Sequence, residues 1–254
     1  MAESTAILRP RRARPWDAGP EATARDVAAL RFVGEQYTAR SDVLSVLLGR
    51  LSPAVVREPG RLGDRTVRQR VERWEAAGWA ERRRMLGHTW VLPTRAGLRL
   101  AGLELDPWTP AVDRLAHHHA AAVVRLAREP MPGRRGGWVC ERELWRRRGR
   151  ASWHMADGAL PAPVPGGWQG ISEAWELVEV VLTLKARPRV VAAVKTRPPH
   201  TALITYYVPV ALHAPLSLLL ASVVRELGGR PPVMVEPLPQ VPGVTYLTAG
   251  GDAG

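Results

Sequence analysis

The stretch Ala174 to Lys185, AWELVEVVLTLK, carries groups that could do chemistry on one side of a predicted strand. From Glu179 onward polar and apolar positions alternate, so one face carries Glu179, Val181, Thr183 and Lys185. A carboxylate and an amine on the same face raise three alternatives. The stretch is a nuclease active site, the remnant of one, or a half-buried strand with two charged ends.

The spacing of Glu179 and Lys185 argues against an intact active site. The two residues are six positions apart, which is roughly 20 Å along an extended strand. An active site of the Glu-x-Lys type places both groups two residues apart on one strand face. Without a bend or a bulge they cannot both reach one metal ion, so we expect a strand that keeps the fold and has lost the catalyst.

Other catalytic patterns find little support in the sequence. His117, His118 and His119 are consecutive on a predicted helix and fan out at about 100° per residue, so all three cannot bind one ion. We expect one of them on the helix face and the others in solvent. The single cysteine, Cys140, excludes an internal disulfide framework and multi-cysteine zinc modules. No spacing supports a Ser/His/Asp or Cys/His nucleophile, and no phosphate-binding loop suggests ATP hydrolysis.

The charge of the chain favours a nucleic-acid partner. Its 254 residues include 36 Lys and Arg against 24 Asp and Glu, a net charge of +12 that is nearly all arginine. Guanidinium groups bind phosphate bidentately and release condensed counterions. Arginine-rich codon usage is the alternative explanation, but the arginines also cluster. No apolar run approaches the roughly 20 residues that span a bilayer, and no secretory signal follows the basic start, so we expect a cytoplasmic protein without membrane contact.

The first half of the chain has the periodicity of a small helical domain with one hairpin. In chain order we expect helices over 24–36 and about 43–48, a helix over 64–78, strands over 79–84 and 89–92, and a helix from residue 94. Ser41 and Asp64 are the predicted N-caps of the second and third helices, and Gly78 ends the third. Val67, Val71 and Trp74 form the predicted buried stripe of that third helix.

This order, together with the words RVERWEAAGWAERRR and HTWVLPTRAGLRLA, resembles a winged helix-turn-helix. The resemblance implies that the third helix enters the major groove of double-stranded DNA and that the hairpin lies on phosphates. The predicted DNA-contacting residues are Arg65, Thr66, Arg68, Gln69, Arg73, Arg82, Arg83, Arg84 and His88. The alternative is a winged helix that binds protein, with its arginines in solvent.

Two prolines between Asp106 and Pro110 predict a domain boundary. Beyond it strands alternate with helices, which include one expected over 187–195 and one from about Pro215 to Leu227, and this alternation predicts an α/β domain. The chain is thus expected to be α+β overall, with a disordered basic arm (1–22), a winged helix (23–106), an α/β domain (107–236) and a flexible tail (237–254). The densest basic run of the chain would add phosphate contacts through Arg146, Arg147, Arg148 and Arg150.

Several short motifs in this half, together with the winged-helix block, resemble the replication-relaxation family of plasmids and integrative elements. They are the helix with Leu115-Ala-His-His-His119, the segment Trp138-x-x-Glu141-Arg-Glu-Leu, the turn His154-x-x-Asp157, and Val178-Glu179-Val-Val-Leu-Thr183 with Lys185. The resemblance covers about residues 25 to 228. It implies a domain related to restriction endonucleases of the PD-(D/E)xK type, and roles in plasmid replication, DNA relaxation or conjugal transfer.

In such nucleases two acidic residues hold Mg²⁺ and a lysine steadies the attacking water. Carried over to this sequence, Asp157 and Glu179 would be the metal ligands, Lys185 the lysine, and Glu141 an upstream acidic partner. The second acidic position of the family strand is Val181 here, which favours a degenerate site.

The sequence therefore predicts a sequence-preferring double-stranded DNA-binding protein with an inactive nuclease-like domain and no cofactor. Two alternatives stay open: a Mg²⁺-dependent DNA nickase, and a winged-helix adaptor or transcription regulator. Replication or conjugation proteins are expected partners, and a homodimer through the helix after Pro110 is an open option.

Overall fold

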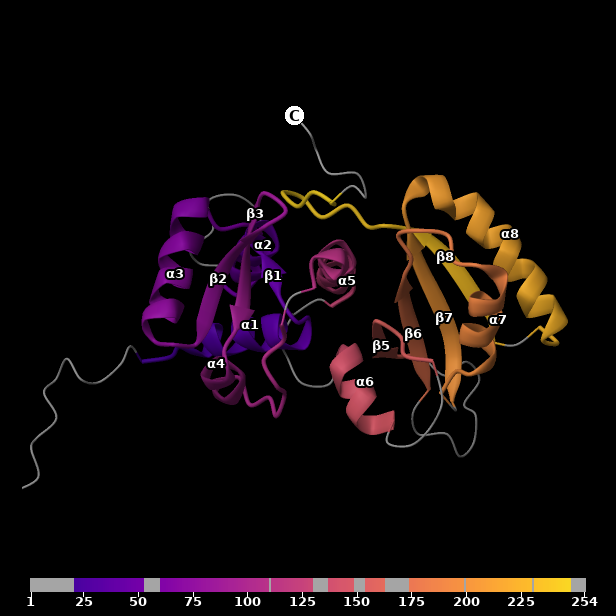
Figure 1. The fold of residues 1–254 in the computed structure, drawn as a ribbon, viewed down its shortest axis with the longest axis horizontal. Coiled ribbons are helices and arrows are strands. Elements are labelled where there is room, and N and C mark those ends of the chain that lie inside the picture. The colour runs from indigo at the N-terminus through magenta and orange to yellow at the C-terminus, as the bar shows by residue number, and fades with distance from the viewer. Residues whose placement is uncertain are drawn as a thin grey trace, which may run out of the picture.

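The computed structural model describes residues 21–52, 60–109, 111–129, 137–148, 154–162, 174–198, 200–229 and 231–247. Over these ranges the chain is α+β, with helices and two β-sheets (Figure 1). None of the helices in these ranges combines the length and the hydropathy needed to cross a membrane. Apart from residues 21 and 22, the predicted basic arm lies outside the described part of the chain.

The first half contains the predicted series of helices and one hairpin. Its elements are α1 (Ala24–Glu35), β1 (Ala39–Arg40), α2 (Ser41–Arg50), α3 (Asp64–Ala76), β2 (Ala80–Met85), β3 (His88–Pro93) and α4 (Arg95–Leu100). The three strands form an antiparallel sheet in the order β1-β3-β2. The short strand β1 is an addition that the sequence did not predict, because two residues carry no periodicity.

Two of the predicted helix caps are wrong. Ser41 and Asp64 are the first residues of α2 and α3, and the capping positions are held by Arg40 and Gly63 without a side-chain hydrogen bond. Asp64 instead forms an exposed ion pair with Arg61, 3.3 Å away. Its carboxylate still lies in the first turn of α3, where a negative charge favours the helix dipole.

The hairpin of β2 and β3 closes through a two-residue turn. Leu86 and Gly87 both have positive φ, 50° and 73°, between the paired residues Met85 and His88. Positive φ at both central positions is the geometry of the tight turns that match strand twist. Leu86 is a costly residue for this conformation, and its side chain is 49% exposed.

The first core lies under α3 and the hairpin. Val67, Val71 and Trp74 are buried as predicted. The Trp74 indole donates a hydrogen bond of 2.8 Å to the fully buried Asp26, and Arg70 lies 3.0 Å from the same carboxylate. These contacts fix α3 on the domain, so the outward face of this helix has one defined orientation.

The second half contains a mixed sheet of five strands. Its elements are α5 (Leu115–Arg128), β4 (Val139–Cys140), α6 (Glu141–Arg148), β5 (Gly158–Pro161), β6 (Trp175–Val180), α7 (Arg187–Lys195), β7 (Thr201–Val208), α8 (Val210–Glu226) and β8 (Val233–Pro237). The strand order is β4-β5-β6-β7-β8, with β6, β7 and β8 parallel. Helices α7 and α8 cover the outer face of this sheet (Figure 1).

The structure corrects the predicted ends of two elements. Strand β6 ends at Val180, so Val181 to Lys185 are not part of the extended strand that their alternation predicts. Helix α8 starts at Val210 and includes Pro215, where the sequence predicted its beginning. Strand β5 was also missed, because it is short and ends at a proline.

Helix α5 belongs to both halves of the molecule and lies between the two sheets (Figure 1). Ala122, Val123 and Leu126 pack in the first core, whereas Ala120 and Val124 pack against the five-stranded sheet. Because the helix buries opposite faces in the two cores, it couples them through one rigid element.

A buried ion triad adds to this coupling. The Arg125 guanidinium of α5 lies 2.6 Å from Glu35 of α1 and 2.7 Å from Glu129. Arg125 is fully buried and also lies over the Phe32 ring. A buried charge is tolerated only when it is paired and hydrogen-bonded, so α1 and α5 are held at one relative position.

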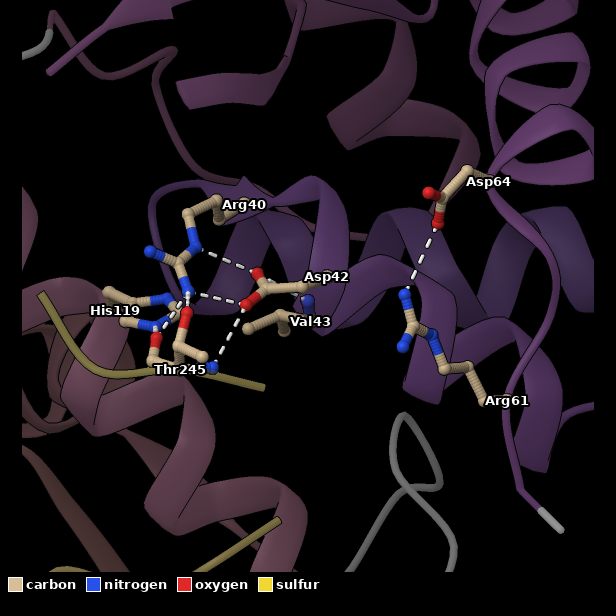
Figure 2. Close-up of polar contacts among 7 residues, drawn as sticks. All are labelled: Arg40, Asp42, Val43, Arg61, Asp64, His119 and Thr245. Carbon is tan, nitrogen blue, oxygen red and sulfur yellow. Dashed lines mark hydrogen bonds and ion pairs between the residues drawn. The ribbon is translucent and has the colours of Figure 1, made fainter. Parts of the chain in front are cut away.

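The segment that follows β8 returns to the first half. We call residues 238–247 the C-terminal strap. Val241 and Val244 are buried in the first core. Figure 2 shows the Arg40 guanidinium between the Asp42 carboxylate and Thr245, with His119 beside them. The sequence predicted a flexible tail over 237–254. The structure places residues 238–247 of that tail against the core, and residues 248–254 lie outside the described part.

Candidate functional site

The predicted acidic residues come together where β6 ends. Asp157 precedes β5, and its backbone amide donates to the Val178 carbonyl over 3.0 Å. Its carboxylate accepts a hydrogen bond of 2.7 Å from the Val180 amide. Two hydrogen bonds to the backbone of β6 thus hold Asp157 in place. Glu179 lies on that strand, between the two bonded residues Val178 and Val180.

Each of the two carboxylates is paired with a histidine from another part of the chain. His117 Nε2 of α5 lies 2.7 Å from Asp157 Oδ1. His154 Nε2 lies 2.9 Å from Glu179 Oε1, close enough for an ion pair when the ring is protonated. We call these four residues the His-carboxylate cluster. The sequence motifs contained both histidines, but nothing in their spacing assigned either one to a carboxylate.

Burial and charge set the proton affinities of this cluster. The Asp157 carboxylate raises the pKa of His117 above its ordinary value, although burial opposes it. Burial acts to raise the pKa of Asp157, but His117, the Val180 amide and Lys185 bring the net pKa below its usual value. Burial raises the pKa of Glu179, and contact with Glu179 raises that of His154. Each partner of the His117 and Asp157 pair thus shifts the pKa of the other in the direction that stabilises the ionic form.

Lys185 lies within electrostatic reach of both carboxylates. Its ammonium lowers the pKa of Asp157 and of Glu179. The predicted separation of roughly 20 Å assumes an extended strand, and that assumption is wrong because the chain turns after Val180. The bend brings Lys185 back toward Glu179.

Two further polar groups border the cluster. The Tyr206 side chain of β7 is aligned with Glu179 in the parallel register, and its buried hydroxyl has no hydrogen-bond partner among the described residues. Glu141, the predicted upstream acidic partner, accepts a hydrogen bond of 3.1 Å from the Tyr37 hydroxyl. Burial, and then the charge of Asp157, raise the pKa of Glu141. The acidic residues therefore form one electrostatic unit.

In this arrangement the two carboxylates are engaged by histidines rather than directed at a common metal site. Across the described ranges, no three His, Cys, Asp or Glu side chains are placed to hold one ion together. Asp157 and Glu179 each direct an oxygen to a histidine. A Mg²⁺ ion needs near-octahedral oxygen ligands, and both side chains would have to leave their partners to supply them.

The other two consecutive histidines are not in solvent, which corrects the prediction made for them. His118 packs between the rings of Tyr37 and Trp108, with ring centroids 4.5 and 4.8 Å away. His119 Nε2 donates a hydrogen bond of 2.8 Å to the Thr245 carbonyl, which can only accept, so Nε2 carries the proton. Burial lowers the pKa of each ring to about 4.

The predicted DNA-contacting residues fall into two groups. Arg65, Thr66, Arg68 and Gln69 on α3, and Arg84 on β2, are exposed. Over the part of the chain that is described, no ion pair or hydrogen bond involves their side chains.

The remaining predicted contacts are at least partly engaged. Arg82 pairs with Glu75 at 2.7 Å, Arg83 pairs with Glu81 at 2.7 Å, and Arg73 donates to the Glu21 carbonyl. His88 is half-buried at the hairpin tip. These pairs are exposed and weak, so they reduce the basic charge of the hairpin without removing it.

The predicted accessory phosphate contacts on α6 are also neutralised in part. Arg146 lies 3.0 Å from Glu104 and 3.3 Å from Glu143, and Arg147 lies 3.1 Å from Glu143. The Arg148 side chain and the whole of Arg150 lie outside the described part of the structure.

A cleft opens above the His-carboxylate cluster. Its volume is about 820 Å³, and its lining includes the hairpin tip, the start of α5, the chain after β6, and Leu247 of the C-terminal strap. His117 and Lys185 both contribute to this lining. Within the cluster, His117 is therefore reached from the side of the hairpin.

Comparison with known proteins adds no relative. No protein-family model, no curated protein and no solved structure matches this chain.

Proposed function

We propose that the chain is a double-stranded DNA-binding protein that docks through α3 and the hairpin of β2 and β3. The order α1-β1-α2-α3-β2-β3 and the sheet order β1-β3-β2 support a winged helix, in which the third helix enters the major groove. In this proposal the five-stranded sheet is a nuclease-like scaffold, and the protein acts in replication, relaxation or transfer of a mobile element, as the replication-relaxation resemblance implies.

The exposed face of α3 carries the proposal. Arg65, Arg68 and Gln69 project from a helix whose other face is fixed by Trp74. Arginine and glutamine are side chains that read guanine and adenine edges in the major groove. Because the two arginines have no acidic partner among the described residues, binding DNA does not require an internal ion pair to break.

Salt dependence is the first test. A surface that neutralises about six phosphates loses about 10³ in affinity between 50 and 200 mM salt. The measurement is the Kd for a labelled duplex from the chain's own locus, by fluorescence anisotropy across that salt range. A basic protein that ignores DNA at moderate salt would support the protein-adaptor alternative instead.

Two variants test the docking geometry. Arg68→Ala is expected to cost about 1–3 kcal/mol on the preferred duplex and to reduce its preference over a scrambled one. Arg84→Ala should weaken both duplexes alike, because a hairpin arginine contacts phosphate. Arg225→Ala, which removes an exposed arginine from α8, is the matched control and should leave both Kd values unchanged. If Arg68→Ala and Arg84→Ala both bind as the wild type does, the docking geometry is wrong.

One observation favours a second candidate, a DNA nickase. Lys185 lies within electrostatic reach of Asp157 and Glu179, which is the set of groups that the family resemblance implies. Supercoiled plasmid is incubated with the protein and Mg²⁺ or Mn²⁺, and the protein is then digested away. Open-circular product that is lost in Asp157→Asn supports nicking. A band shift that disappears with the protein supports binding alone.

A further inference from the structure

The cleft beside the hairpin has walls of two chemical kinds. Leu86 at the hairpin tip and Val112 before α5 are 49% and 54% exposed, and Leu182 and Leu247 also line the cleft. Exposed aliphatic side chains that gather on a concave surface mark an interaction site more often than single ones do. These side chains suit a flat apolar group.

The polar part of the lining is cationic. Arg114 and Lys185 both line the cleft, and neither side chain forms an ion pair or a hydrogen bond with any residue that the structure describes. Asp113 is the acidic residue of the lining. The charges of Asp157 and Glu179 behind it are offset by His117 and His154. The lining thus keeps a positive balance that suits a phosphate.

The cleft is continuous with the proposed DNA-docking surface. Leu86, Gly87 and His88 are at once the tip of the hairpin and one wall of the cleft. A strand that separates from a duplex held on the hairpin would therefore meet this opening first. The volume of about 820 Å³ lies in the range of pockets that enclose small ligands, so it suits one or two nucleotides and excludes a duplex.

We propose that this cleft binds the first unpaired nucleotides of a single-stranded DNA extension next to the duplex, with a base between Leu86 and Val112 and a phosphate at Arg114 and Lys185. This inference rests on the proposed function, since the duplex must be docked for its extension to arrive. It makes the preferred ligand a junction of double-stranded and single-stranded DNA.

The experiment compares one duplex in three forms: blunt, with a four-nucleotide 5′ extension, and with a four-nucleotide 3′ extension. We expect one of the two extensions to tighten Kd about tenfold, the equivalent of about 1.4 kcal/mol. A 2-aminopurine as the first unpaired base should change its fluorescence on binding, because it enters the cleft.

Two variants assign the gain to the cleft. Arg114→Gln and Val112→Asp each alter an exposed residue, and each should remove most of the tenfold gain while the blunt duplex keeps its Kd within about twofold. Arg225→Gln and Leu218→Asp on α8 are matched controls, since Leu218 is 75% exposed, and they should keep the gain. Thermal melting of each variant checks that it folds. If Val112→Asp does not fold, Arg114→Gln alone tests the cleft.

The outcomes separate this inference from the proposed function. If the wild type binds the blunt duplex and neither extension improves Kd, the cleft inference is wrong and duplex docking stands. The inference is also overturned if the gain survives in Arg114→Gln and Val112→Asp. If no duplex is bound and Arg68→Ala changes nothing, the proposed function itself fails.

Discussion

Paired ionisable residues define the centre of the molecule at the scale of single side chains. Glu179 is buried, and the Asp157 side chain beside it is 11% exposed, so the two carboxylates would be unfavourable if both were charged and unpaired. His117 and His154 offset this cost, and the Val180 amide adds a hydrogen bond to Asp157. The two carboxylates, the two imidazoles and the Lys185 ammonium therefore interact electrostatically. Removing any one of these groups shifts the pKa values of the neighbouring carboxylates and imidazoles.

The pH dependence of stability tests the His117 and Asp157 pair. The folded-state pKa of His117 is raised above its ordinary value of 6.5 by Asp157, so the stabilisation is complete below pH 6.5 and is lost as pH rises through the folded pKa. The wild-type melting temperature should fall between pH 6 and pH 9 in part for this reason. In His117→Gln the fall should be smaller.

The control for this prediction is His88→Gln, which removes a half-buried histidine that has no carboxylate partner in the described part of the chain. It should keep the wild-type fall in melting temperature. An equal fall in wild type and His117→Gln would mean that the pair does not hold in solution.

Close approaches between neighbouring elements decide where the hairpin lies. Thr94 caps α4 and donates to the Gly78 carbonyl, so the end of α3, the start of β2 and the start of α4 meet within a few residues. Gly97 allows this meeting, because a Cβ there would lie 1.9 Å from the Trp79 carbonyl oxygen. No side chain can be fitted at that distance without moving backbone.

Gly97→Ala should therefore destabilise the protein although alanine favours helices. We expect a loss of about 1–3 kcal/mol in the free energy of unfolding, the usual cost of overpacking, measured by urea denaturation with tryptophan fluorescence. Gly63→Ala is the matched control, since a Cβ there meets nothing within 4 Å. Equal stability of the two variants would show that α4 can move away from β2.

The two halves of the whole molecule are joined by α5 and by the C-terminal strap. Helix α5 packs in both cores. The C-terminal strap crosses from β8 to the first half, where Thr245 contacts Arg40, Asp42 and His119 (Figure 2). The cleft lies between these two connections and the hairpin, so its shape depends on both halves remaining in place.

Val244→Asp tests whether the C-terminal strap stabilises the whole molecule. Val244 is buried against the first core, and an unpaired carboxylate there should lower the free energy of unfolding by about 3 kcal/mol. Hydrogen exchange should also rise in α2, because Asp42 of that helix accepts a hydrogen bond from the Thr245 amide of the strap. The matched control is Gln240→Asp, an exposed position of the same strap, which should stay within about 0.5 kcal/mol of wild type. Unchanged stability in Val244→Asp would mean that the strap is only loosely attached.

Local signals in the sequence were sufficient for most of the elements. The bounds predicted for α7 match the structure, and the hairpin and the buried stripe of α3 are where the periodicity places them. These features depend on residues a few positions apart, because helix periodicity, tight turns and strand alternation are short-range properties.

Only the tertiary structure decided what the ionisable residues do. His117 meets Asp157 across 40 positions, and no periodicity carries information over that distance. The alternation from Glu179 to Lys185 predicted one straight strand, but the packing of the chain after Val180 ended it. The sequence by itself thus determined the elements and the basic character of the protein. The pairing of its charges, the bend after Val180 and the cleft required the whole fold, because they depend on contacts between segments that are distant along the chain.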